Sequence, residues 1–81
     1  MEPTIDGRKS VVGSKQLRKA LQAGRAEYVY LAKNADPAVT EPLEKLCGEL
    51  HIQITWVQSM AELGRTCGIE VGAAAAAVLR S

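Results

Sequence analysis

The stretch Ser10–Gly24, SVVGSKQLRKALQAG, changes its hydrophobic pattern once, and this change predicts the fold. It opens with a short β-branched run, which favours a strand. After a small polar turn, apolar residues that include Leu17 and Leu21 recur at helical spacing and predict a helix with one buried face. Ser14 is a suitable N-cap because its hydroxyl can accept from backbone N–H groups of the first turn, and Gly24 can take the left-handed conformation that ends a helix. We therefore expect a strand, a turn and a helix here.

A second strand and a second helix follow in the sequence. Residues 27–33, EYVYLAK, are apolar on both alternating faces, which is typical of a central strand covered on both sides. Residues 36–50, DPAVTEPLEKLCGEL, predict a helix capped by Asp36, with its main part starting near Thr40 so that Pro42 is tolerated. One buried stripe of this helix would hold the residues at i, i+3, i+4 and i+7, which are Leu43, Leu46, Cys47 and Leu50.

The next segment predicts a third strand and a short helix. Residues 51–58, HIQITWVQ, alternate well enough for a strand, and we expect Trp56 to pack in the core with Tyr28 and Tyr30. Ser59 precedes Glu62 by three residues, which is the spacing of a capping box and predicts one or two helical turns ending at residue 64.

The alanine-rich residues 71–80, VGAAAAAVLR, are compatible with a helix or a strand. Alanine favours helix on propensity, whereas Gly72 and the alternating order of elements favour a buried strand, which we expect here. With a small helix within residues 3–9, the predicted fold is α/β. It is a single domain over residues 1–81, a three-layer α/β/α sandwich around a four-stranded mixed sheet.

Length and composition fit one small globular domain. The chain has 81 residues, of which 47% are hydrophobic and 23% charged. No apolar run approaches the roughly 20 residues that span a bilayer, and the N-terminus lacks the order of a signal peptide, so we expect a cytoplasmic protein without membrane contact. Cys47 and Cys67 are too few for a disulfide scaffold and form no CxxC pair, so reduced thiols are expected.

Few residues support catalysis or cofactor binding. The glycines match neither GxxxxGK[ST] nor GxGxxG. Cys67 lies near glycines and follows Arg65, so a lowered thiol pKa is conceivable, but no partner is evident and a packing role is favoured. His51 lies at a helix-to-strand junction without a second residue that would make a base or a metal site. We therefore predict no catalytic residue, no metal and no cofactor.

The charge is unevenly distributed along the chain. Residues 1–33 hold seven basic and three acidic residues, whereas residues 34–81 hold three basic and six acidic. Such asymmetry can mark a nucleic-acid face, although an evenly solvated surface is commoner. Lys15 and Lys19 share one helix face beside Gln16, at the positive end of the helix dipole. Lysine and glutamine can donate to base edges, and the alternative for this surface is a solvated helix face.

Three motifs in order carry a resemblance to a known family. They are GSKQLRKALQAG (residues 13–24), LAKNADP (residues 31–37) and SMAELGRTCGIEVGAAAAAV (residues 59–78). Together they resemble the L7Ae/L30e family of ribosomal proteins, and most closely its small bacterial, YbxF-like branch. The resemblance implies an α/β/α sandwich that binds kink-turn RNA, a helix–bulge–helix element bent at tandem sheared G·A pairs.

The resemblance also implies which residues contact the RNA. The start of the helix after the first strand would enter the major groove at the G·A pairs, and the loop before the alanine run would pack on the bulged nucleotides. Archaeal and eukaryotic members carry Asn-Glu where this sequence has Lys15-Gln16, a form that the bacterial branch shares. The implied RNA-binding residues are Gly13, Ser14, Lys15, Gln16 and Lys19, then Lys33 and Asp36 near the extruded base, and finally Gly68, Ile69, Glu70 and Val71.

The expected function is therefore that of a non-enzymatic, monomeric RNA-binding protein that recognises a kink-turn in a ribosome or another ribonucleoprotein. One alternative is a protein-interaction module of a ribonucleoprotein that touches RNA only incidentally. A second alternative is a thiol enzyme that uses Cys67.

Overall fold

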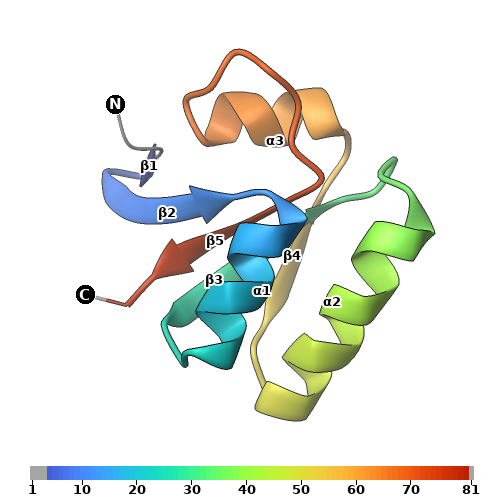
Figure 1. The fold of residues 1–81 in the computed structure, drawn as a ribbon. Helices are drawn as coiled ribbons and strands as arrows, with labels where there is room; N and C mark the ends of the chain where they lie inside the picture. Colours follow the sequence, from blue (N-terminus) through green and yellow to red (C-terminus); the bar gives the residue numbers. More distant parts are fainter. Residues whose placement is uncertain (1–3, 81) are drawn as a thin grey trace.

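The strand β2 (Arg8–Val12) and the helix α1 (Ser14–Gln22) follow one another as the sequence predicts, joined at Gly13 (Figure 1). The structure, a computed structural model, describes residues 4–80. Gly13 has a φ of 106° and occupies the N-cap position of α1, where its carbonyl accepts from the Leu17 N–H at 2.9 Å. Residues with a side chain rarely adopt this φ, so glycine makes the sharp turn from strand to helix possible.

The prediction that Ser14 caps α1 is wrong. Ser14 is the first helical residue, and no side chain accepts from the first turn. The chain needs a positive φ to leave β2, so the glycine takes the cap position and the serine is moved into the helix. The other end is as predicted: Gly24 has a φ of 70°, and its N–H donates to the Leu21 carbonyl at 3.1 Å.

A two-residue turn, Asp6-Gly7, joins a short first strand, β1 (Thr4–Ile5), to β2 in an antiparallel hairpin. Both turn residues have positive φ, 52° and 76°, as in the hairpin turns that Asp-Gly sequences favour. The predicted small helix within residues 3–9 is therefore wrong over the described part of this segment, and residue 3 lies outside it.

The described residues form one mixed sheet of five strands, one more than predicted, because β1 adds to the four expected strands. With β3 (Ala26–Ala32), β4 (Ile54–Val57) and β5 (Ala75–Leu79), the order is β1-β2-β5-β3-β4. Only β3 and β4 pair in parallel. The alanine run is the strand β5, as expected, because pairing with both β2 and β3 and burial outweigh the helix propensity of alanine.

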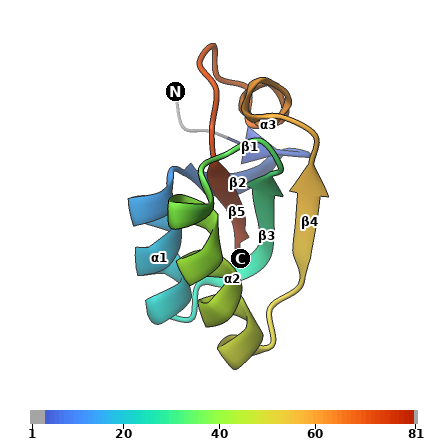
Figure 2. The same cartoon turned by 90° about the vertical axis from the view of Figure 1, so that its right-hand side faces the viewer.

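Helices cover both faces of the sheet, as the sandwich prediction requires (Figure 2). α1 and α2 (Pro37–Leu50) lie over one face, and α3 (Met60–Thr66) lies over the other. Each face has its own buried cluster. The first includes Leu17, Leu21, Val29, Leu31, Leu43 and Cys47, and the second includes Ile5, Ala32, Leu63, Cys67, Ala76 and Val78.

The helix α2 is longer than predicted. Its cap is Asp36, as expected, whose Oδ1 accepts from the Ala38 N–H at 2.9 Å. The helix begins at Pro37 instead of near Thr40 and continues through Pro42. Because Pro42 is exposed, water can bond to the carbonyl that the proline leaves without a helical donor.

The helix α3 also extends past its predicted end. Ser59 caps it as expected, since its Oγ accepts from the Glu62 N–H at 3.1 Å. The helix passes through Gly64 and ends at Thr66, after which Gly68 has a φ of 73°. The left-handed residue that follows this helix is therefore Gly68, and the helix does not end at Gly64.

Three side chains predicted to be buried are substantially exposed. Leu50, in the last turn of α2, is 43% exposed, although Leu43 and Cys47 of the same stripe are fully buried. Trp56 is 39% exposed on the edge strand β4, and Tyr28 is 43% exposed. The Arg8 guanidinium, rather than a helix, lies over the Tyr28 ring, at 5.9 Å from its centroid.

We predict that Leu43→Ala lowers the free energy of unfolding by about 2–5 kcal/mol, because it leaves a cavity between α2 and the sheet. Leu50→Ala is the matched control on the same helix, and we expect a change of less than about 1 kcal/mol, because Leu50 is already largely in water. Equilibrium unfolding in urea measures both. Equal losses would contradict this assignment of the α2 stripe.

Candidate nucleic-acid interface

The candidate site lies at the edge of the sheet where β2, β3 and β4 end. β5 runs antiparallel to β2 and β3, and β3 runs parallel to β4, so the carboxyl ends of these three strands meet the amino end of β5. Four connections meet at this edge: the Gly13 turn into α1, the β3–α2 loop over residues 33–36, the β4–α3 connection over residues 58–59, and the α3–β5 loop over residues 67–74 (Figure 1). The predicted RNA-binding residues therefore lie in connections at this edge or in α1, which begins there.

Four hydrogen bonds hold this edge of the sheet together. The Gly13 N–H donates to the Ala75 carbonyl at 2.8 Å, which links the start of α1 to the end of the α3–β5 loop. The Ala32 N–H donates to the Ala74 carbonyl at 3.0 Å and the Lys33 N–H to the Val57 carbonyl at 2.8 Å. The fourth bond involves a side chain: Asn34 Oδ1 accepts from the Met60 N–H at 2.8 Å, so the β3–α2 loop holds the first residue of α3.

The start of α1 presents polar and basic groups to solvent. Lys15, Gln16 and Lys19 are exposed and Ser14 is half-buried, while Leu17 fixes the opposite face of the helix in the core. The first turn contains no acidic residue and has no side-chain cap, so its N–H groups can donate hydrogen bonds to an acceptor on a ligand. Together with the helix dipole, Lys15 gives this end of α1 a positive potential, and Lys19 adds a positive charge further along, in the last turn of the helix.

The β3–α2 loop contributes Lys33 and Asp36, which are both exposed. The Asp36 side chain also caps α2. Asn34, which the sequence analysis did not single out, positions α3 through its bond to Met60. An Asn in a loop before a capped helix is the signal that could have drawn attention to it.

The α3–β5 loop divides its side chains between the core and the solvent. Ile69 is partly buried and packs against the second cluster, whereas Val71 is 70% exposed. Gly68 and Glu70 are also exposed. The apolar group that the loop offers to a ligand is therefore mainly Val71, and Ile69 mainly anchors the loop.

Two glycines hold this loop against α3. A Cβ on Gly64 would overlap the carbonyl oxygen of Val71, and one on Gly72 would lie 3.3 Å from the Cβ of Met60. The Ile69 N–H donates to the Gly64 carbonyl at 3.0 Å. Gly64 and Gly72 therefore bring the loop close to its own helix. A glycine inside a helix is the sequence signal for such a close approach.

The two cysteines do not form a reactive site. Cys67 is 1% exposed and Cys47 is fully buried, and burial raises the pKa of both thiols. The raised pKa of Cys67 contradicts the lowered value that a thiol enzyme would need. His51 is exposed at the end of α2, with a φ of 58°.

Within residues 4–80, no group of three His, Cys, Asp or Glu side chains lies close enough to hold a metal ion. None of the helices in this part of the chain combines the length and the apolar character that crossing a bilayer requires.

We predict that Gly64→Ala lowers the free energy of unfolding, although alanine is the better helix former by about 1 kcal/mol, because its Cβ forces the α3–β5 loop to move. Gly48→Ala in α2 is the control. No heavy atom lies within 4 Å of its Cβ position, so we expect it to stabilise by about 0.5–1 kcal/mol. Urea unfolding measures both variants, and stabilisation of both would mean that the Gly64 contact is unimportant.

Sequence and structure comparisons place this arrangement among known proteins. The sequence model of the Ribosomal protein L7Ae/L30e/S12e/Gadd45 family matches residues 4–81. The chain is 40% identical to an RNA-binding protein of Geobacillus sp. (strain WCH70) and 40% identical to the RNA-binding protein YbxF of Geobacillus stearothermophilus. Each match covers 98% of this chain and 96% of the relative.

The fold also matches that of a solved structure. The 15.5kD RNA binding protein of Giardia lamblia matches with a TM-score of 0.82 and 26% identity, over 89% of this chain and 61% of that one. The resemblance stated from the sequence is thus confirmed. The prediction that the chain is not an enzyme is confirmed as well, because the family is described as ribosomal and these relatives are named RNA-binding proteins. The chain belongs to the Ribosomal protein L7Ae/L30e/S12e/Gadd45 family.

Proposed function

We propose that this protein binds RNA and that it recognises a kink-turn, with α1 and the α3–β5 loop acting as one surface. The observation that carries the proposal is the Gly13–Ala75 hydrogen bond of 2.8 Å, which fixes the start of α1 beside the end of that loop. The names of the relatives, RNA-binding proteins of nearly the same length, support the broader part of the proposal. A bent RNA with a bulge offers a groove and unstacked bases close together, and proteins recognise RNA mainly at such features.

The start of α1 would contact the G·A pairs and the adjacent phosphates. Lys15, Gln16 and Lys19 are exposed side chains that can donate to base edges, and each good paired contact contributes about 1–3 kcal/mol of discrimination. The uncapped N–H groups near Ser14 can bind a phosphate oxygen. Gly13 has no side chain to keep the RNA backbone away from this turn.

The α3–β5 loop would contact the bulged nucleotides. Val71, exposed over 70% of its surface, offers an apolar group to an unstacked base, and Gly68 and Glu70 lie exposed near it. Because Gly64 and Ile69 already hold the loop against α3, little conformational entropy remains to be lost on binding.

The β3–α2 loop would contact the nucleotide that is turned out of the stack. Lys33 is exposed and can pair with a phosphate. Asp36 uses Oδ1 as the cap of α2, and its carboxylate has further lone pairs that can accept from a base amino group.

The surroundings of this interaction follow from the family. Since the description of the family names ribosomal proteins, we propose that the RNA belongs to a ribosome or another ribonucleoprotein in the cytoplasm. The protein would act there as a single-domain monomer that favours the bent state of the RNA by binding it more tightly than the extended state.

We predict that Lys19→Ala lowers the affinity for a kink-turn RNA by roughly 5- to 150-fold, which corresponds to one lost base contact. The loss on a plain duplex should be smaller, because there the lysine only pairs with phosphates. Lys45→Ala removes an exposed lysine from the middle of α2 and should leave both affinities almost unchanged. Fluorescence anisotropy titrations at fixed salt measure all of them.

The same titrations need an RNA in which Watson–Crick pairs replace the G·A pairs. Equal losses for Lys19→Ala on the kink-turn and on the duplex would exclude base recognition by α1. If the wild-type protein binds the kink-turn and the altered RNA equally well, kink-turn recognition is excluded, and incidental RNA contact by a protein-interaction module becomes the better description.

A further inference from the structure

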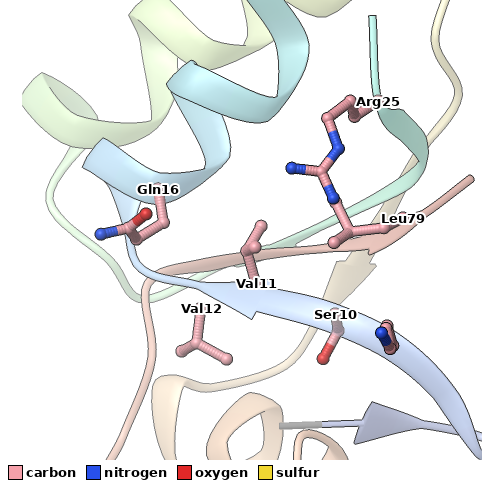
Figure 3. A pocket seen from close by; sticks show the side chains of 7 residues that line it. Ser10, Val11, Val12, Gln16, Arg25 and Leu79 are labelled. Atoms are coloured by element: carbon pink, nitrogen blue, oxygen red, sulfur yellow. The ribbon is translucent and has the colours of Figure 1, made fainter. Parts of the chain in front are cut away.

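A groove lined by basic residues runs along α1 and beside β2. It starts next to the candidate interface and extends away from that edge of the sheet. Figure 3 shows Val11 and Leu79 on its floor, with Gln16 and Arg25 projecting on either side of them. Three adjoining hollows make up the groove, and all three are lined by Arg25 and Leu79. The groove is therefore a continuous feature of the surface.

The lining of this groove is strongly one-sided in charge. It contains no acidic residue, although the chain as a whole has 9 acidic and 10 basic residues. Half of the basic residues of the chain lie here: Arg8, Lys9, Lys19, Arg25 and Arg80. The groove therefore favours a partner that carries several negative charges.

Most of these charges are exposed to solvent. Arg8 pairs with Glu27 and lies over the Tyr28 ring, so its guanidinium is already engaged. The other four are exposed, and within residues 4–80 the structure shows no ion pair for them. A phosphate chain would thus gain attraction without first breaking an ion pair between described residues.

The groove is continuous with the proposed RNA surface. Gln16 and Lys19 line it and also belong to the residues that we place against the G·A pairs. From there it follows α1 to Arg25, just beyond the end of the helix. The 9 residues of α1 are about 13 Å long, so the groove beside this helix is long enough for more than one phosphate of a strand.

We infer that this groove binds the phosphate backbone of one of the two RNA stems that flank the kink, beyond the nucleotides that define it. The inference rests on the proposed function. Lys9, Arg25 and Arg80 would contact phosphates without reading the sequence, so they would contribute affinity and fix the direction in which the stem leaves the protein. Val11 and Leu79 form an apolar floor that keeps the stem at the distance at which the long basic side chains reach its phosphates.

The test uses kink-turn RNAs whose stems differ in length. One RNA has stems that end close to the kink, and two others each have one stem extended by about six base pairs. The slope of log K against log salt changes by about 0.9 for each phosphate contact. For wild-type protein we therefore expect a steeper slope on one of the two extended RNAs than on the short one.

The double variant Lys9→Gln/Arg25→Gln should lower that slope by about 1.8, corresponding to two phosphate contacts, and should bind the short RNA like the wild type. Arg25→Lys, which keeps the charge, should retain most of the slope. Lys45→Gln controls for loss of a charge elsewhere, and thermal unfolding checks that each variant is folded.

The outcomes separate this inference from the proposed function. If the wild type prefers the kink-turn to the G·A-disrupted RNA but the double variant keeps the wild-type slope on both extended RNAs, the groove does not bind a stem. Equal losses on the short and extended RNAs would also overturn the inference. If the wild type does not prefer the kink-turn, the proposed function fails and the inference fails with it.

Discussion

The position of β5 between β2 and β3 is the constraint on which the rest of the structure depends. Because β5 runs antiparallel to both neighbours, the loop that precedes it must arrive at the edge where α1 begins. Three consecutive alanines, Ala75, Ala76 and Ala77, are fully buried, so the strand is covered on both faces. A longer side chain at these positions would separate the helices from the sheet, and both parts of the interface would move with them.

The two parts of the proposed interface differ in physical character, as the binding of a bent RNA would require. The start of α1 is basic and carries backbone donors without a cap, which matches phosphates and base edges. The α3–β5 loop offers an exposed Val71 on a backbone that Gly64 and Gly72 hold against α3. A regular duplex would meet the first part only, whereas an RNA with a bulge beside a helix can meet both.

The sequence predicted the order of the elements from strand β2 onward because hydrophobic periodicity is a local property, and the three motifs predicted the family. It did not predict the exposure of every apolar side chain. Leu50 and Trp56 carry the pattern of core residues, but their exposure depends on where neighbouring elements end. The role of Gly64 was missed for the same reason, because its contact with Val71 exists only after the chain has folded. The β1–β2 hairpin is the exception, since the Asp-Gly pair at residues 6 and 7 is a local signal that the sequence analysis did not use.

The most direct measurement is the mapping of backbone amide chemical shifts while a kink-turn RNA is added to the labelled protein. If α1 and the α3–β5 loop form one binding surface, signals from residues 13–19 and from residues 68–71 change together and reach saturation at the same RNA concentration, while those of the outer face of α2 stay in place. Changes confined to one of the two segments, or saturation at different RNA concentrations, would contradict a single surface.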